Sequence, residues 1–554
     1  MNNLYEIFKS NIKKCIIIFF ASYFLLGVNI VKDYGISFDE ETTRLYGLMN
    51  GNYVLKKFLP QEKYDSIFSK ITTSKFSNKI KEKQPQEFDN FEDKVYGAIF
   101  ELPVVAIEIF LNIKDSNDIY FFRHLINFIF FFVFLLFFFK LLNKVFNNKI
   151  YSLFGCLILI TSPRIFAQSF YNSKDIIFLS FFVISNYYGY SLILKNKIKN
   201  LFLFCFFSAC LINLRVVGGI VPLTILLIML FNDIVNKVSV LKKEYIFIPI
   251  LIVLSLYIIW PYLWDDPINN FINVIKYFSN HPWHLKNFYL GEYVKATEIQ
   301  WHYLPIWIIV TTPIFFLIIT SAGLLLFFVN IKKKFKKIKD IYIFFTLSFY
   351  VILPILLAIS LGSTLYDGWR HFYFILPFLI FFALYFVDFL FNYKQFKIVR
   401  IISIFLFFLF FLNIYHMIRL HPHQYLYFNN FIIKDSLNKF ERDYWGLSNK
   451  EILNVFLTKT NDDKIVYAFI GSMFPLSIQI LNNKDQSRFI DVNKIKKIDN
   501  YKGPIYIFVN NRFNPNYELI KNNAETIHEL IIDGVIINGV YKFKDLSNYK
   551  LTRE

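Results

Sequence analysis

The chain has 554 residues, of which 55% are hydrophobic, and it carries 60 Lys and Arg against 41 Asp and Glu. Soluble domains are usually about 45–50% apolar, so the composition excludes an ordinary soluble enzyme and indicates a polytopic membrane protein. The formal net charge of +19 does not indicate a nucleic-acid-binding protein, because the basic clusters lie at the ends of apolar segments, where they orient a chain in a membrane.

Eleven apolar segments are candidate membrane spans, since a span needs about 20 predominantly apolar residues. They cover residues 15–31, 120–142, 150–167, 175–194, 200–213, 216–231, 245–263, 303–330, 341–363, 372–391 and 400–418. The pair 200–213 and 216–231 is short and is divided by Arg215, so it forms either two short helices or one broken helix. Basic residues precede the first segment without a convincing cleavage site after it, which predicts an uncleaved first helix.

The distribution of basic residues tests the number of spans. With the N-terminus in the cytoplasm and spans alternating in direction, every strong cluster falls on the cytoplasmic side: Lys140–Lys149, Lys195–Lys199, Lys237–Lys243, Lys332–Lys339 and Lys394–Arg400. A single span over 200–231 would place the later clusters outside. The pattern therefore favours about 11 transmembrane helices, a cytoplasmic N-terminus and an extracytoplasmic C-terminus.

Two long loops and the C-terminal region lie on the predicted outer side. The first extracytoplasmic loop, residues 32–119, ends in an apolar segment, residues 96–111, whose acidic residues are typical of a helix lying on the membrane surface. The second loop is residues 265–302. Apolar runs end near His421, and segments such as "DKIVYAFIG" and "GVIINGVYKF" have the composition of strands. We therefore expect a transmembrane domain over 1–419 and a soluble extracytoplasmic α/β domain over 420–554.

Three consecutive acids, Asp39, Glu40 and Glu41, follow the first span directly in "GISFDEETTRLYG". Ser37 and Glu40 fit a capping box, with Ser37 as the N-cap of a helix, and Glu40 is spaced to pair with Arg44 one turn later. This explanation leaves Asp39 without a required role, although an acid in a first helical turn is generally favourable. On local grounds a helix start and a catalytic acid are equally supported.

Several basic residues sit at the predicted outer surface, where Lys and Arg should be scarce. Snorkelling to the lipid headgroups explains most of them; they are Arg123, His124, Arg164, Lys174, Arg215, Arg370 and His371. Arg215 is harder to explain in this way, because a broken helix at that depth would line a cavity. Arg370, within "LYDGWRHFYFILP", suits an anionic ligand such as a lipid phosphate.

"NSKD", residues 172–175, opens another predicted span on the outer side. Asn172 or Ser173 could cap that helix with Asp175 in its first turn, and the functional alternative places Asp175 beside Asp39 in one outer site. Aromatic and histidine residues around the second long loop, including Trp301 and His302, are typical of an interfacial belt.

The sequence offers no clear metal or disulfide pattern. His281, His284 and His302 have no paired metal-ligand spacing. The four cysteines all lie inside apolar runs, where they are expected to pack as small apolar side chains; they are Cys15, Cys156, Cys205 and Cys210. We therefore expect no cofactor, and no motif supports a divalent metal.

Five segments together carry a resemblance to a known family: "FDEETTRLYG", "SFYNSKDIIF", "NLRVVGG", "WHYLPIWIIVTTP" and "YDGWRHFYFILP". Their order and sidedness, over most of residues 35–377, resemble the GT-C superfamily of membrane glycosyltransferases. Within it the dolichyl-phosphate-mannose–protein mannosyltransferase-like branch and its bacterial members are most similar. The resemblance implies a GT-C fold in the inner (plasma) membrane. It also implies inverting transfer of a sugar from a polyprenyl-phosphate donor to an extracytoplasmic acceptor.

The resemblance also implies roles for particular residues. The acidic pair of the family falls on Asp39 and Glu40, with Asp39 as the catalytic base. A cation near the leaving polyprenyl phosphate would offset its charge, and the candidates are Arg215, Arg370 and Lys174. Further candidates for substrate binding are Asp175, His371, Trp369, Trp301 and His302. The expected partners are the lipid bilayer, the polyprenyl-phosphate sugar and an acceptor glycan, lipid or protein, with no nucleic acid.

The acceptor stays open. The chain has no sign of the large lumenal β-trefoil insertion of protein mannosyltransferases, so a lipid-linked glycan or a cell-envelope component is at least as good an acceptor as a protein.

Two other classes of function also stay open. A transporter or flippase would also use Arg215 in a broken helix, although it rarely needs so long a first outer loop. A third alternative is a scaffold whose C-terminal domain binds a partner.

Overall fold

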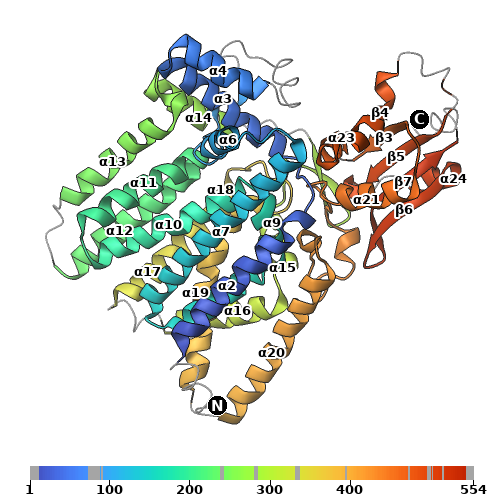
Figure 1. The fold of residues 1–554 in the computed structure, drawn as a ribbon. Helices are drawn as coiled ribbons and strands as arrows, with labels where there is room; N and C mark the ends of the chain where they lie inside the picture. Colours follow the sequence, from blue (N-terminus) through green and yellow to red (C-terminus); the bar gives the residue numbers. More distant parts are fainter. Residues whose placement is uncertain are drawn as a thin grey trace.

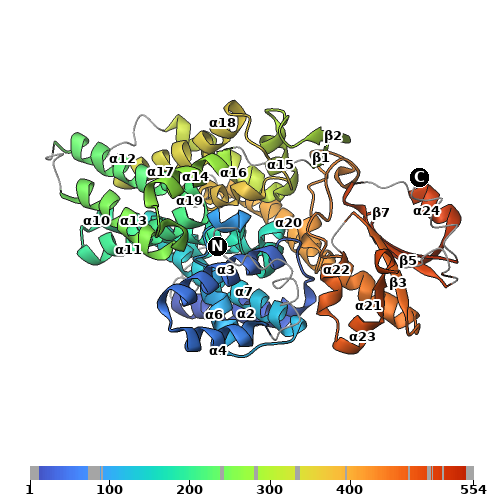
Figure 2. The ribbon, with the colours of Figure 1, turned by 90° about the horizontal axis from the view of Figure 1, so that it is seen from above.

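The structure, a computed structural model, describes residues 11–72, 88, 91–237, 243–279, 285–330, 337–393, 396–471, 474–495, 501, 503–513 and 517–544. It is a bundle of helices with a smaller α/β unit at one end (Figure 1). The N-terminal end of α2 and the start of α20 lie at the opposite end of the bundle from this unit. Seen from above, the C-terminal sheet lies beside the bundle (Figure 2).

Helices occupy all eleven predicted spans. They are α2 (Ile12–Ile30), α7 (Ser116–Phe146), α8 (Lys149–Ile160), α9 (Pro163–Tyr171), α10 (Asp175–Leu194), α11 (Ile198–Leu214), α12 (Ile220–Val235), α13 (Lys243–Ile259), α15 (Tyr303–Thr311), α16 (Ile314–Val329), α17 (Ile338–Thr346), a π-helical turn η7 (Leu347–Ile352), α18 (Leu353–Ser360), α19 (Leu376–Asn392) and α20 (Phe396–Arg419). Among the described residues, seven helices are long and apolar enough to cross a membrane, and the bent pair α8 and α9 makes up to eight.

The predicted apolar segments are interrupted at three places, and prolines explain two of them. Pro163 begins α9, and α8 and α9 meet at 74°, because the residue before a proline avoids the helical conformation. Pro313 divides the predicted segment 303–330 into α15 and α16 for the same reason. Arg215 is extended, with φ −154° and ψ 129°, between α11 and the short 3-10 turn that precedes α12. The predicted break at Arg215 is therefore present.

The first long loop forms helices at the end of the bundle that faces away from the N-terminus (Figure 1). These are α3 (Glu40–Phe58), α4 (Gln61–Thr72) and α6 (Glu101–Phe110), and α14 (Pro267–Ser279) joins them. In α6, Glu101 and Glu108 are buried while the Phe110 side chain is 86% exposed. This pattern fits the predicted helix on the membrane surface, because its acids face the protein while Ile107 and Phe110 face outward.

The C-terminal unit contains a five-stranded sheet in the order β4-β3-β5-β7-β6. Its strands are β3 (Ile465–Ile470), β4 (Phe489–Asp491), β5 (Ile505–Asn510), β6 (Glu525–Ile532) and β7 (Val535–Phe543). β3 runs parallel to β4 and β5, whereas β7 is antiparallel to β5 and β6. Its helices are α21 (Asn449–Lys459), α22 (Phe474–Ser477), α23 (Asn483–Arg488) and α24 (Tyr517–Asn523). The predicted α/β composition of this region is confirmed, and Phe456 of α21 packs on Phe508 in the core of the unit.

A short hairpin joins the bundle to the segment that leads into the α/β unit. It consists of β1 (Lys286–Tyr289) and β2 (Glu292–Lys295). The backbone N–H of Gly291 donates to Lys439, and the N–H of Glu441 donates to Phe288. On its other side, Leu365 donates its N–H to Ala296. The hairpin therefore holds the loop before α19 close to residues 439–441, two segments that meet again in the polar cluster below.

Candidate active site

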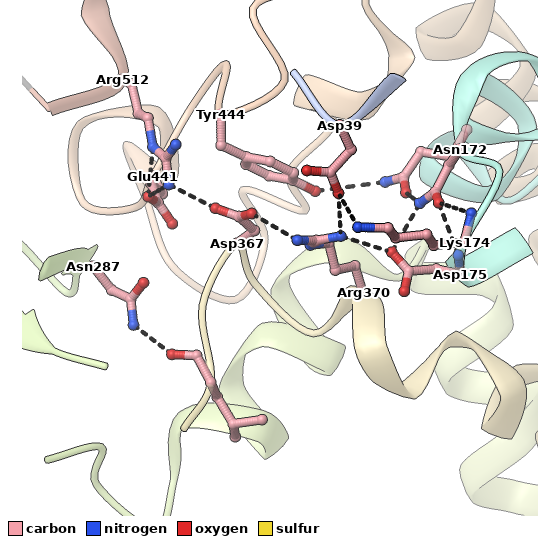
Figure 3. A network of polar contacts seen from close by, with 12 residues as sticks. Asp39, Asn172, Lys174, Asp175, Asn287, Asp367, Arg370, Glu441, Tyr444 and Arg512 are labelled. Carbon is pink, nitrogen blue, oxygen red and sulfur yellow. Dashed lines mark hydrogen bonds and ion pairs between the residues drawn. The ribbon is translucent and has the colours of Figure 1, made fainter. Parts of the chain in front are cut away.

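Asp39 and Arg370 lie at the centre of a polar cluster (Figure 3). Asp39 precedes the first turn of α3, and Arg370 opens the 3-10 turn η8 (Arg370–Ile375) before α19. The Arg370 Nη1 atom is 3.3 Å from Asp39 Oδ2 and 3.0 Å from Asp175 Oδ2. Lys174 Nζ is 3.9 Å from Asp39 Oδ2. The structure thus brings together four predicted site residues from three distant segments.

Asp175 is held in place by the start of its own helix. The Asn172 side chain accepts from the backbone N–H of Asp175 at 2.8 Å and donates to Asp175 Oδ2 at 2.9 Å. Arg215 contacts Oδ1, the other oxygen of the same carboxylate. Lys174, and not Asn172 or Ser173, is the N-cap residue of α10, so the predicted cap is wrong, although Asn172 holds Asp175 from just before the helix. Asp175 remains turned toward two arginines. This arrangement suits a buried carboxylate that balances their charge.

The cluster has a buried floor and an accessible rim. The side chains of Arg370 and Asp175 are 4% and 1% exposed, whereas that of Asp39 is 23% exposed. Lys174 and Arg215 are also partly exposed, at 25% and 23%. Of the two carboxylates that Arg370 Nη1 contacts, Asp39 is therefore the one that a substrate can reach, and Lys174 and Arg370 flank it.

Aromatic rings surround the cations. The guanidinium carbon of Arg370 lies 4.8 Å from the ring centre of Trp445 and 5.2 Å from that of Tyr366. Lys174 lies over Tyr46 and Tyr96 at 5.1 and 5.2 Å. Burial, followed by the charges of nearby groups including Asp39, raises the pKa of both tyrosines, so their phenols stay protonated. Such rings attract cations through their faces without competing as anions.

Glu40 points away from this cluster, and here the predicted capping box is only half correct. Its carboxylate accepts from the backbone N–H of Ser37 at 2.6 Å and contacts His124 Nε2 at 2.9 Å. The helix begins at Glu40 with Asp39 as its N-cap residue, so Ser37 is not the N-cap. The Ser37 hydroxyl has no hydrogen-bond partner among the described residues. Arg44, expected to pair with Glu40, instead donates to Glu108 of α6 at 3.1 Å.

A second layer of charges extends the cluster to the C-terminal unit. Asp367 Oδ2 is 3.1 Å from Arg370 Nη2, and Asp367 Oδ1 is 2.7 Å from Arg512 Nη2. Arg512 also contacts Glu441 Oε1 at 2.9 Å. Burial raises the pKa of Asp367, although Arg512 and Arg370 oppose that shift. Burial also raises the pKa of Glu441 to about 7, despite the opposing effect of Arg512.

The remaining predicted site residues lie at the edge of the cluster or away from it. His371 packs its ring against Tyr366, and Trp369 donates from Nε1 to Thr311 at 2.7 Å. His302 is 2.6 Å from the Tyr289 hydroxyl, and Trp301 is exposed beside it. None of the contacts described for Trp301 or His302 involves Asp39, Asp175 or Arg370. These two residues do not join the cluster.

Asp367, Glu441 and Arg512 belong to this second layer, and none of them was predicted from the sequence. Asp367 lies three residues before Arg370 within a segment already singled out, and this spacing is a usable signal for an ion pair. Glu441 and Tyr444 lie in "FERDYWGLS", which had no assigned role. Nothing in the local sequence around Arg512 indicates a contact with a residue 145 positions earlier.

A pocket of about 400 Å³ borders this second layer. Its lining includes Phe38, next to Asp39, together with Tyr444, Trp445, Asn449 and Arg512. The first loop and the C-terminal unit therefore enclose it from two sides. The walls are mainly apolar and aromatic, which is the usual character of a small-molecule site with a few polar groups.

The described residues contain no group of three or more His, Cys, Asp or Glu side chains that could hold a metal ion. His281 and His284 lie outside the described residues, so the histidine set considered from the sequence is not represented. The chemistry available in the described cluster is that of carboxylates, guanidinium groups and an ammonium group.

Comparison with known proteins adds one family match. Residues 104–264 match the family model described as dolichyl-phosphate-mannose-protein mannosyltransferase. The resemblance expected from the sequence is confirmed over this segment, which contains Lys174, Asp175 and Arg215. No curated protein matches the sequence.

Two similar solved structures are of ArnT from Cupriavidus metallidurans. The one bound to undecaprenyl phosphate has 9% sequence identity and a TM-score of 0.45, and the match covers 95% of this chain and 97% of that chain. The apo structure has 8% identity and a TM-score of 0.47, with 96% and 98% covered.

Proposed function

We propose, from the match of residues 104–264 to the mannosyltransferase family model, that this chain is a membrane glycosyltransferase. It would move a sugar from a polyprenyl-phosphate donor to an acceptor, with inversion at the anomeric carbon. The observation that carries the proposal is the position of Asp39, a partly exposed carboxylate flanked by Lys174 and Arg370. A base next to cations is what transfer from a phosphate leaving group requires.

Asp39 would act as the general base. Its free carboxylate oxygen takes the proton of the acceptor hydroxyl as that oxygen bonds to the anomeric carbon. The bond between the anomeric carbon and the phosphate oxygen breaks, and the polyprenyl phosphate leaves with the electron pair. A single displacement of this kind inverts the anomeric centre. Positioned bases of this type typically contribute about 10²–10⁴ to a rate.

Lys174 and Arg215 are the better candidates for binding the donor phosphate. Both are partly exposed at the rim, whereas Arg370 is buried and has carboxylates at both ends of its guanidinium. Cations placed where charge develops on a leaving group stabilise the transition state. Arg370 would then orient Asp39 and Asp175 instead of holding the phosphate itself.

A flippase for an anionic lipid is the second candidate, because Arg215 lies at a break between two apolar helices. Extended backbone in a membrane segment is tolerated where it lines a cavity. In this chain, however, Arg215 contacts Asp175 of the Asp39 cluster. That contact places the break next to the proposed transfer site and favours a role in binding the donor.

The test is donor turnover by the purified protein in nanodiscs. A panel of polyprenyl-phosphate sugars, including polyprenyl phosphate mannose, would be incubated with envelope glycolipids as acceptors. Mass spectrometry would measure the polyprenyl phosphate released and the glycosylated product. Release that requires both an acceptor and Asp39 supports the proposal. Movement of an intact donor across a liposome membrane, with no sugar transferred from any member of the panel, would replace it with the flippase.

A further inference from the structure

The sheet of the C-terminal unit contacts the Asp39 cluster through Arg512, which pairs with Asp367. Arg512 follows β5, in the turn η14 (Asn511–Phe513). Asn510, the last residue of β5, donates to Asp443 Oδ2 at 2.9 Å and accepts from the backbone N–H of Arg512 at 3.0 Å. The end of a central strand thus fixes where the Arg512 side chain begins.

Asp367 connects Arg512 to Arg370. Each oxygen of the Asp367 carboxylate serves one arginine, since Oδ1 is 2.7 Å from Arg512 and Oδ2 is 3.1 Å from Arg370 (Figure 3). Asp367 contacts Nη2 of Arg370, while the contacts to Asp39 and Asp175 use Nη1. Asp367 therefore holds one end of the guanidinium and leaves the other end facing the proposed base.

The backbone that carries Asp367 is also fixed from outside its own segment. Asp367 and Gly368 both have positive φ, at 57° and 73°, a conformation that aspartate tolerates better than most residues. Asn287 of β1 donates to the backbone oxygen of Leu365 at 2.7 Å. This bond fixes the turn, but the Asp367 carboxylate is almost fully buried and needs ionic partners to stay charged.

Glu441 orients Arg512 from the opposite side. Its Oε1 atom accepts from Arg512 Nε at 3.0 Å, while its Oε2 atom has no partner among the described residues. Arg512 therefore forms ion pairs with Glu441 on one side and with Asp367 on the other. The charged and titratable groups that act on Asp367 or lie in the cluster around it are Arg512, Arg370, Glu441, Asp39, Asp175, Lys174, Arg215, His371, Tyr303, Tyr366 and Tyr444.

We propose that Arg512 is a positioning residue for sugar transfer, which holds Asp367 so that Arg370 keeps Asp39 in place. The α/β unit is then part of the catalytic apparatus without touching the reacting atoms. The link to catalysis rests on the proposed function of Asp39. The effect of Arg512 on the position of Arg370 does not depend on that function, and it can be measured separately.

The main variant is the double substitution Arg512→Met with Glu441→Gln. Arg512→Met alone would leave Glu441 buried without its cation and Asp367 with Arg370 as its remaining partner, and the variant could fail to fold. The double variant removes a cation and an acid together, but Asp367 still loses one of its two arginines. Arg488→Met is the matched control, because Arg488 lies in the same unit and pairs with Asp485 at 2.9 Å, away from the cluster.

The first measurement is hydrogen–deuterium exchange of peptides covering residues 361–375 in the parent and both variants at pH 6 and pH 8. Loss of Arg512 removes an interaction that favours the charged form of Asp367, so this carboxyl takes up a proton at higher pH than in the parent. Exchange in these peptides should therefore rise in the double variant, and more at pH 6 than at pH 8. The control should match the parent.

The second measurement is donor turnover at the same two pH values, with polyprenyl phosphate mannose as the first probe. We expect kcat for donor turnover in the double variant to fall about tenfold at pH 6 and about threefold at pH 8, with little change in KM. Unchanged exchange in the double variant, or a turnover loss equal at both pH values, would overturn the proposal. If the parent itself transfers no sugar, the proposed function fails, and the exchange measurement still decides whether Arg512 controls the Arg370 segment.

Discussion

Two sets of ion pairs lie at the end of the bundle that carries the first long loop, and they are built differently. Arg44 with Glu108 and Arg123 with Glu101 are pairs whose side chains are almost completely buried. In the Asp39 cluster, one guanidinium is shared among Asp39, Asp175 and Asp367, and the rim is open to solvent.

Asp39 and Glu40 are adjacent in sequence but belong to different sets. Glu40 turns inward to Ser37 and His124, while Asp39 stays at the rim. Arg123 with Glu101 joins the first loop to α7 of the bundle, and Arg44 with Glu108 joins two helices of that loop, so these buried pairs have a structural role. A shared and partly exposed cluster, in contrast, leaves one carboxylate available for chemistry.

The first prediction is all-or-none and concerns the side of the membrane on which both sets lie. Alkaline phosphatase fused after residue 430 should be active, because the basic clusters of the sequence predict an extracytoplasmic C-terminus. A fluorescent cytoplasmic reporter at the same position should be dark. An inactive phosphatase with a bright reporter would place the cluster in the cytoplasm, where an extracytoplasmic acceptor could not reach it.

The second prediction tests the buried pairs. Arg123→Met leaves Glu101 buried without its cation, which should cost about 3–5 kcal/mol of the free energy of unfolding. Melting in detergent would measure the loss, and turnover per folded molecule should stay near the parent value. Adding Glu101→Leu should recover much of the stability, because an apolar pair avoids the unpaired charge. A variant that melts like the parent but has lost turnover would show that this pair belongs to the active site.

The third prediction tests the rim cations. Lys174→Met and Arg215→Met should each weaken use of the polyprenyl-phosphate donor by about one to two decades, since a charge-assisted hydrogen bond contributes about 1.5–3 kcal/mol. The measurement is kcat/KM for the donor, with binding of polyprenyl phosphate by native mass spectrometry as a second readout. Parental binding and turnover in both variants would mean that these residues only snorkel to the headgroups.

The fourth and smallest prediction uses Glu441, whose pKa burial raises to about 7 from an ordinary value of 4.5. A carboxyl with a raised pKa in the folded protein stabilises it most below pH 4.5, and that contribution is lost as pH rises through 7. Replacing Glu441 with Gln should therefore reduce the loss of stability between pH 6 and pH 8 by about 1–2 kcal/mol, which would be measured as a flatter fall in melting temperature. An unchanged slope would mean that Glu441 does not titrate in this window.

Much of the bundle could be predicted from the sequence because lipid-facing helices need long apolar runs. The break at Arg215 was visible for the same reason, as a charge between two short runs. The division at Pro313 was missed, since apolar residues continue on both sides and only the proline marks the end of α15. Local capping rules explained Glu40 but assigned Ser37 a role that it does not have.

Part of the site was predictable because some of its residues are basic on the predicted outer side, where Lys and Arg should be scarce. Lys174, Arg215 and Arg370 were singled out in this way, and the structure brings them together around Asp39 and Asp175. Arg512 was not predictable, because its partners Asp367 and Glu441 come from other segments and no periodic pattern connects them. Charge pairs that form only when separate units pack together leave little trace in one sequence.

The proposed transfer reaction depends on Asp39, and not Glu40, as the catalytic base. The most direct test compares Asp39→Asn with Glu40→Gln in sugar transfer from a polyprenyl-phosphate donor, using purified variants with matched melting temperatures. Each change keeps the size of the side chain and removes a carboxylate. Loss of a general base should lower kcat of Asp39→Asn by about 10²–10⁴, while Glu40→Gln should lose stability and much less of the rate. Near-parental transfer by Asp39→Asn would contradict the account, and a larger rate loss in Glu40→Gln would move the base to the buried neighbour.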